Sequence, residues 1–136
     1  PPTITDPARL AGGWIGRIGQ PIERPGWLSQ ADLDYYVDEF TRAGFRGGVN
    51  YYRNFDANWT LMKDKDPIVK IPSAFLSGAA DQVIQGANEQ ALRAMMDPVM
   101  SDFREITLLP EMGHWVQQED PEGTNKAILR FLEELA

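Results

Sequence analysis

The chain contains a single histidine, and its position suggests that it moves protons. His114 follows residues 104–110, which predict a short strand that ends at Pro110. Beyond it, Asp120 can cap a helix that begins at Pro121, and the apolar face of that helix consists of Ala127, Ile128, Phe131, Leu132 and Leu135. An imidazole on a loop between a strand and a helix is placed to accept and release protons. An isolated histidine more often packs in a core or caps a helix, but this placement favours catalysis.

A carboxylate is predicted at the same edge of the fold. Residues 69–76 indicate a buried strand that ends at Ser77 and Gly78, and Asp81 follows on the next loop. Functional groups in open α/β sheets collect at the carboxyl ends of the strands, so Asp81 and His114 are expected on neighbouring strands. Such a carboxylate accepts the imidazole Nδ1–H and stabilises the imidazolium. Asp81 could instead only cap the following turn, but we favour its pairing with His114.

A tyrosine pair is the third candidate. Residues 49–62 predict a helix, and its apolar stripe consists of Phe55, Trp59 and Met62. A phenol in a cleft could donate a hydrogen bond to an oxygen that gains charge in a transition state. Aromatic residues at this spacing more often face a core. The spacing also does not separate Tyr51 from Tyr52, because each lies within about one helical step of the stripe.

The remaining elements place these residues in an α/β fold. Ser29 and Asp32 can form a capping box that begins a helix, and Gly44 can end it. A further helix is predicted over residues 88–96, and the Pro- and Gly-rich start leaves room for a short helix near residues 7–12. The chain closes with a βαβα unit, which right-handed crossover geometry places in a parallel sheet. Parallel sheets need more strands and helices on both faces, so we expect part of a larger fold.

Composition narrows the classes of partner and site. The 136 residues are 43% hydrophobic, as expected for a globular chain, and their net charge of −7 argues against nucleic acids and anionic membranes. The absence of cysteine excludes disulfides, a thiolate nucleophile and a thiolate-ligated metal, and there is no second histidine to build an imidazole metal site. No apolar run is long enough to span a bilayer. The start carries neither a secretory signal nor a methionine, so we expect a cytoplasmic protein and a chain that begins inside a longer one.

Two runs resemble the second part of the lid of soluble epoxide hydrolases, in the α/β-hydrolase superfamily. They are Asp32-Leu33-Asp34-Tyr35-Tyr36-Val37-Asp38-Glu39-Phe40 and Gly44-Phe45-Arg46-Gly47-Gly48-Val49-Asn50-Tyr51-Tyr52-Arg53-Asn54. The Gly-x-x-Asp motif that ends at Asp81 and the Gly113-His114-Trp115 motif fit the same family, and the similarity covers most of the chain. The resemblance implies part of a helical lid over residues 1–66. It implies the C-terminal part of an α/β-hydrolase core over residues 67–136.

The resemblance also implies roles for individual residues. A lid tyrosine that follows an Asn-x pair points to Tyr52 rather than Tyr51 as the residue that binds the epoxide oxygen and supplies a proton. Asp81 would orient His114, and His114 would activate the water that hydrolyses an alkyl-enzyme ester. Trp115 and Val83 would lie beside the substrate channel. The implied substrate is a small hydrophobic epoxide.

Three features of the family have no counterpart in residues 1–136. They are the nucleophilic aspartate, the His-Gly-x-Pro oxyanion segment and a second lid tyrosine. We therefore expect an N-terminal half of the same fold as a partner. A homodimer is also possible. Three alternative functions stay open: a haloalkane dehalogenase, an esterase and a non-catalytic interaction fragment. A sharp cooperative melt of residues 1–136 alone would favour the fragment, whereas we expect poor solubility because an unpaired strand edge would be exposed.

Overall fold

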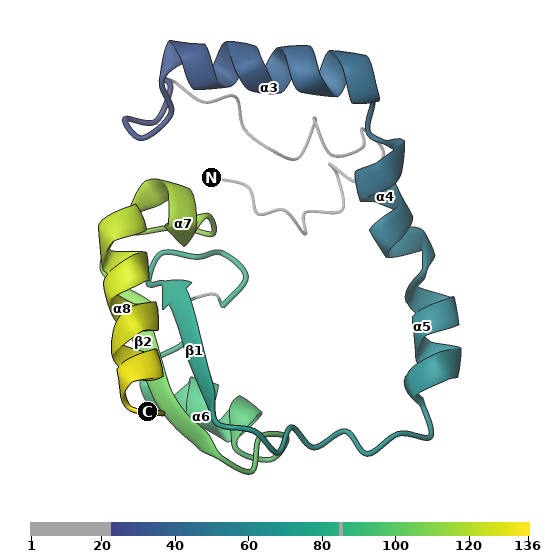
Figure 1. Cartoon of the computed structure of the whole chain (residues 1–136), viewed down its shortest axis with the longest axis vertical. Coiled ribbons are helices and arrows are strands. Elements are labelled where there is room, and N and C mark those ends of the chain that lie inside the picture. Colours follow the sequence, from purple (N-terminus) through teal and green to yellow (C-terminus); the bar gives the residue numbers. More distant parts are fainter. Residues whose placement is uncertain (1–22, 85) are drawn as a thin grey trace.

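A computed structural model describes residues 23–84 and 86–136. The short helix expected near residues 7–12 lies outside the described residues. Figure 1 shows two groups of elements: α3 runs across the top and α4 and α5 follow it down the right-hand side, while a small sheet with its helices lies at the lower left. In the described part of the chain, no helix is both long and apolar enough to cross a bilayer.

Helix α3 (Gln30–Ala43) begins and ends where the sequence predicts. The Ser29 hydroxyl accepts the Asp32 N–H at 3.1 Å, and the Asp32 carboxylate accepts the Ser29 N–H at 3.2 Å. Gly44 ends the helix with φ of 68°, a conformation that glycine adopts without strain. The predicted capping box and stop are therefore confirmed.

The single helix predicted over residues 49–62 is wrong. The structure has α4 (Arg46–Arg53) and α5 (Phe55–Met62), separated by Asn54 with φ of −90° and ψ of 1°. Asparagine has a lower helix propensity than alanine or leucine, and here its side chain makes no capping hydrogen bond. The break divides the expected aromatic stripe, and the rings of Tyr52 and Phe55 meet edge to face across it at 5.7 Å.

Two parallel strands form the described sheet. β1 (Ser73–Gly78) and β2 (Phe103–Leu109) pair in a register that sets Gly78 opposite Leu109. β1 begins later than predicted, because Val69 makes only an isolated bridge to Met100 and the intervening Pro72 has no N–H to donate. The parallel pairing and the second strand are confirmed. Among the described residues, the outer edge of β1 pairs with no other strand.

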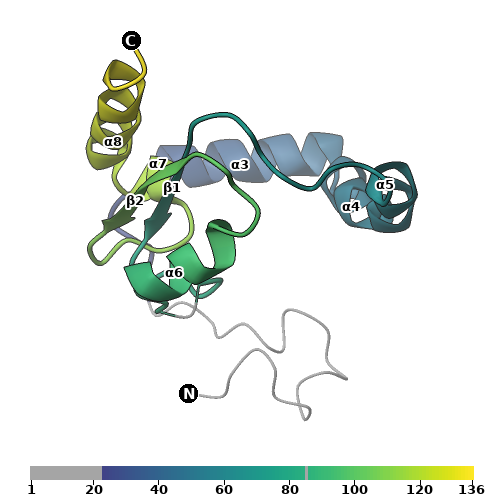
Figure 2. The same ribbon diagram turned by 90° about the horizontal axis from the view of Figure 1, so that it is seen from below.

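Helices cover both faces of this sheet. Figure 2 shows α6 (Glu89–Met96) on one side of the strands and α8 (Pro121–Glu133) on the other. The Asp120 side chain accepts the Gly123 N–H, as predicted, and Asn88, which was predicted as the first residue of the helix, instead caps it by accepting the Ala91 N–H. A one-turn helix, α7 (Val116–Glu119), was not predicted. The buried apolar side chains are Leu92, Leu109, Val116 and Ala127.

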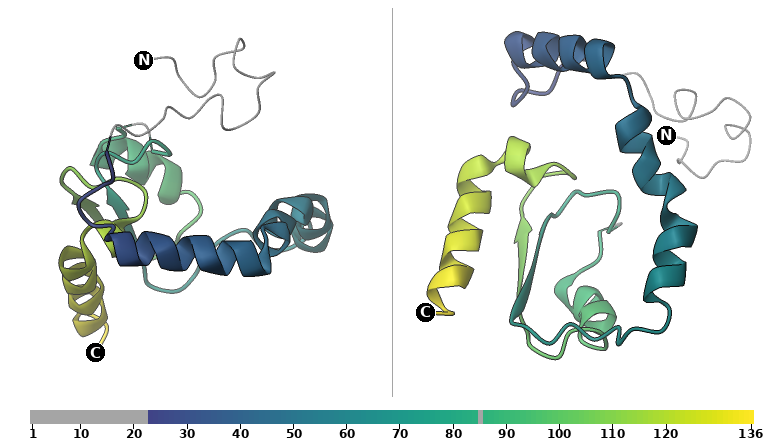
Figure 3. Two further views of the ribbon diagram at one scale, coloured as in Figure 1. Left: turned by 90° about the horizontal axis from the view of Figure 1, so that it is seen from above. Right: turned by 45° about the vertical axis from the view of Figure 1, so that its right-hand side comes forward.

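The helices α3, α4 and α5 bury no residue completely. Both views in Figure 3 show them extending away from the sheet, with the start of α3 nearest to α7. Their exposed aromatic side chains include Tyr36, Phe40, Tyr52 and Trp59. These helices therefore present apolar groups that the sheet and its helices do not cover.

Candidate functional site

The two predicted polar residues meet at the carboxyl end of the sheet. β1 and β2 run in the same direction and end at paired positions, so the loops that follow them lie side by side (Figure 1). The His114 Nδ1 lies 3.0 Å from the Asp81 Oδ2. The contact expected between these side chains is thus present in the structure.

Asp81 is buried and fully bonded. Its Oδ1 accepts the Val83 N–H at 2.8 Å, and its Oδ2 accepts the Ser77 hydroxyl at 3.2 Å as well as the His114 ring N–H. The carboxylate therefore caps the following turn and also contacts His114, so capping is not its only contact. Burial raises the pKa of Asp81, but the hydrogen bonds from Val83, His114 and Ser77 together outweigh burial and hold its pKa below the usual value.

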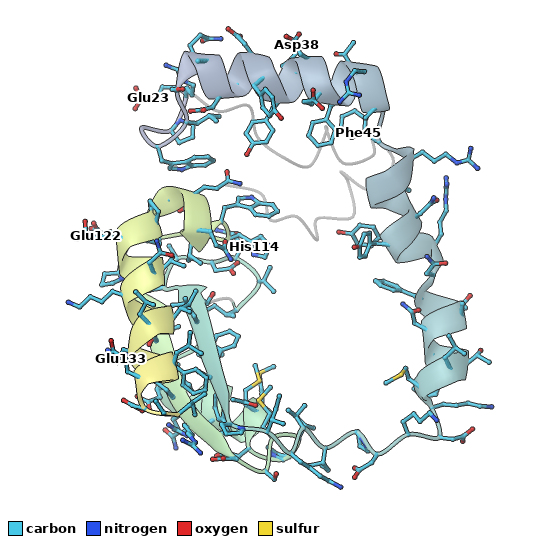
Figure 4. All side chains as sticks on the ribbon, in the orientation of Figure 1. Glu23, Asp38, Phe45, His114, Glu122 and Glu133 are labelled. Atoms are coloured by element: carbon cyan, nitrogen blue, oxygen red, sulfur yellow. The ribbon has the colours of Figure 1, made fainter. Side chains whose placement is uncertain are left out.

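His114 presents its other nitrogen outward. Its side chain is 53% exposed, against 7% for Asp81. Donation from Nδ1 to the carboxylate leaves Nε2 as an acceptor. Figure 4 shows His114 directed toward the side of the molecule on which α4 and α5 lie, away from Glu122 and Glu133. The arrangement can accept a proton at Nε2 and stabilise the resulting cation through Asp81.

A hollow of about 470 Å³ lies beside this pair. Its lining includes Asp81, Val83 and His114 together with apolar residues of α6 and its approach, among them Leu92 and Met95. Trp115 does not line the hollow, and its ring instead stands edge-on to His114 at 4.9 Å. The α6 lining residues were not identified from the sequence, because an amphipathic helix does not reveal which cavity its apolar face meets.

Neither Tyr51 nor Tyr52 makes a hydrogen bond with Asp81 or His114 in the described part of the chain. Tyr51 is 80% exposed and Tyr52 is 72% exposed. Within residues 23–84 and 86–136, no hydrogen bond links either phenol to His114. Nor do these residues contain a group of three or more acidic or histidine side chains able to hold a metal ion.

Gly78 permits the close approach of the two loops. A Cβ at this position would lie 2.1 Å from the Met112 carbonyl oxygen and 2.2 Å from that of Gly113. The Met112 oxygen also accepts the Ala80 N–H at 2.9 Å, so the backbone there has little freedom to move. The Gly78→Ala variant should lose about 1–3 kcal/mol of unfolding free energy, or more, because backbone must shift.

Urea denaturation of purified protein measures that loss. Gly47→Ala is the matched control, since a Cβ there meets nothing within 4 Å and alanine favours the helix by about 0.5–1 kcal/mol. Equal stability of the two variants would show that the loops do not need this contact.

The buried carboxylate should also make stability depend on pH. Because folding lowers the pKa of Asp81, its ionised form adds stability that is complete above the carboxyl pKa of the unfolded chain. That contribution disappears as the pH falls through the lower, folded-state pKa. Asp81→Asn should therefore destabilise the protein most at neutral pH, and the difference from wild type should shrink on acidification.

The measurement is urea unfolding of both proteins between pH 7 and about pH 2, a range that crosses the ordinary carboxyl pKa. The exposed Asp38→Asn change on α3 serves as the control. A pH-independent difference between wild type and Asp81→Asn would contradict the role assigned to the charge.

The chain is similar to named epoxide hydrolases. No family model matches the sequence. "Epoxide hydrolase A" of Mycobacterium tuberculosis is 42% identical over 122 residues, which cover 88% of this chain and 36% of that protein. "Epoxide hydrolase B" of the same organism is 36% identical over 135 residues, covering 97% of this chain and 36% of that protein. The chain therefore spans about a third of the length of these relatives.

Solved structures similar in fold to this chain are also named epoxide hydrolases. Epoxide hydrolase A from Mycobacterium thermoresistibile aligns with a TM-score of 0.75 and 39% identity, over 95% of this chain and 42% of that one. Potato (Solanum tuberosum) epoxide hydrolase I aligns with a TM-score of 0.72 and 30% identity, over 88% and 39%. The fold is the C-terminal part of an α/β-hydrolase fold, and the resemblance to epoxide hydrolases is confirmed.

Proposed function

We propose that this chain is the C-terminal part of an epoxide hydrolase, which converts a small hydrophobic epoxide into a vicinal diol through an alkyl-enzyme ester. The observation that carries the proposal is the 3.0 Å contact between buried Asp81 and half-exposed His114, at the carboxyl end of a sheet similar to that of epoxide hydrolases. The nucleophilic aspartate, the oxyanion segment and a second lid tyrosine would come from an N-terminal half outside residues 1–136.

The first step opens the ring. The nucleophilic carboxylate attacks one epoxide carbon, and the bond between that carbon and the epoxide oxygen breaks. Tyr52 would donate a hydrogen bond and then a proton to the oxygen, whose negative charge grows in the transition state. We assign residues 1–66, with α3, α4 and α5, to part of the lid and residues 67–136 to the core. Closure of the lid would bring Tyr52 toward the epoxide.

The second step hydrolyses the ester. His114 Nε2 would take a proton from water, and the water oxygen would attack the ester carbonyl carbon. Cleavage of the acyl carbon–oxygen bond releases the diol, whose leaving oxygen takes the proton from His114. The acid that remains loses the second proton of the water, which returns to the Tyr52 phenolate, and the carboxylate is restored. Asp81 keeps the imidazole in the required tautomer and stabilises the imidazolium that forms. No metal or cofactor takes part in this scheme.

The hollow beside the pair suits an apolar substrate. Val83, Leu92 and Met95 would contact its hydrocarbon part, while Trp115 would orient the His114 ring at the edge of the channel. The cytoplasmic location and the homodimer considered from the sequence stay predictions.

The test is a single turnover of the complete protein with an apolar epoxide in ¹⁸O-labelled water. An ester mechanism delivers an enzyme oxygen to the diol, so the first diol should be unlabelled and the label should enter the protein. A labelled first diol would refute the ester. Parallel assays with a haloalkane and a nitrophenyl ester separate the proposal from a dehalogenase or an esterase, which would prefer those substrates.

A further inference from the structure

We infer that Glu119 is a positioning residue, which holds the loop that carries His114 through its two carboxylate oxygens. This inference rests on the proposed function of His114 as the base. Oε2 of Glu119 accepts the Gly113 N–H at 2.6 Å, and Oε1 accepts the Trp115 N–H at 2.9 Å. The two donors are the residues immediately before and after His114. One side chain therefore binds the backbone on both sides of the imidazole.

His114 needs this support because little else holds it. The side chain is 53% exposed, and its described contacts are the Asp81 carboxylate and the Trp115 ring. The loop itself lies between β2 and α7 and belongs to neither. Two N–H groups bonded to an ionised carboxylate form stronger hydrogen bonds than neutral partners would. Glu119 thus fixes the backbone on both sides of His114, whose exposed ring makes few contacts of its own.

The base of the Glu119 side chain is itself anchored. Its own N–H donates to the Trp115 carbonyl oxygen at 2.9 Å, which closes the single turn of α7. Val116, at the start of that turn, is buried, and its carbonyl oxygen accepts the hydroxyl of buried Thr124 on α8 at 3.0 Å. α8 therefore holds α7 in place through Thr124, and α7 in turn holds the Glu119 side chain against the loop of His114.

The geometry also leaves little room for another arrangement. A Cβ on Gly113 would lie 3.1 Å from Oε1 and 3.2 Å from Oε2 of Glu119, so the carboxylate lies directly against the loop backbone. A glutamine at 119 accepts at its oxygen only, and its NH₂ group would face one of the two N–H donors. An aspartate keeps the charge, but its shorter side chain does not span both donors.

The decisive experiment compares Glu119→Gln with the matched control Glu133→Gln in the complete protein. Glu133 is an exposed carboxylate near the end of α8, and Figure 4 shows it far from His114. Rapid-quench mass spectrometry with an apolar epoxide follows formation and decay of the ester separately. We expect Glu119→Gln to form the ester at the wild-type rate and to hydrolyse it about 10²-fold more slowly, since displacement of a catalytic group by about 1 Å costs that much. Glu119→Asp should lie between the two, and Glu133→Gln should match wild type.

Two outcomes would overturn the inference. One is unchanged ester decay in Glu119→Gln. The other is an equal loss of formation and decay, which indicates general structural damage. Amide hydrogen exchange at Gly113 and Trp115 supplies a second readout, and faster exchange in Glu119→Gln than in Glu133→Gln is expected. If wild type forms no ester, the proposed function fails, while the exchange rates still decide whether Glu119 holds the loop.

Discussion

Replacement of His114 with glutamine is expected to stop the reaction at the alkyl-enzyme ester and to lower turnover by about 10²–10⁴-fold. Glutamine has a similar reach and can still donate to Asp81, but it has no nitrogen that accepts a proton from water. Ring opening does not require the imidazole as a base, so the ester should form and persist. Intact mass spectrometry after brief exposure to the epoxide should show the protein heavier by the mass of the substrate.

A matched control for this variant is Glu133→Gln, which changes an exposed residue at the end of α8, outside the hollow. It should turn over without accumulation of the ester. Turnover by His114→Gln at the control rate would remove His114 from the mechanism. Loss of turnover without the added mass would place His114 before ester formation rather than after it.

The second large effect is expected from Tyr52→Phe, which should slow ring opening by about 10²–10³-fold, as removal of one oxyanion donor does. This change removes only the hydroxyl of Tyr52, and the ring contact with Phe55 is kept. Hydrolysis of a preformed ester should be unaffected, because that step uses His114. The measurement is the single-turnover rate of ester formation.

Tyr51→Phe is an unusually close control, since it removes the same group from the adjacent and similarly exposed position on α4. It should leave ring opening unchanged. The reverse result would assign the donor to Tyr51 and would mean that the match to the lid motif is displaced by one residue. Equal small effects of both changes would leave the epoxide oxygen without a donor from this helix.

The elements predicted correctly are those whose limits depend on nearby residues. Ser29, Asn88 and Asp120 each accept an N–H three residues further along, so the local sequence contains what is needed to begin a helix there. The pairing of Asp81 with His114 could also be predicted, because neighbouring parallel strands end at one edge and leave few other places for their loops.

The features that were missed depend on contacts between distant segments. β1 begins only at Ser73, because residues 69–72 pair with the neighbouring segment only through the bridge from Val69 to Met100, and sequence periodicity does not show where pairing starts. Helix α7 is too short to produce a periodic pattern. Glu119 bonds the Gly113 N–H only when the loop folds back over α7, so its role cannot be read from the sequence. The break at Asn54 is a separate case: it is local, and the apolar spacing that continues across it from Tyr52 to Phe55 gave no sign of it.

The parallel pairing of β1 and β2 fixes the positions of the two strand ends but not the path of the segment that connects the strands. Asp81 and His114 are fixed by the register at the strand ends, whereas Val83 and Met95 reach the hollow from the excursion that connects the strands. A change in the part of this connection beyond Asp81 would alter the lining of the hollow without a change in the register of the two strands. On the proposed function, substitutions in that part of the connection should therefore change which epoxide is preferred, while the pair of Asp81 and His114 stays in place.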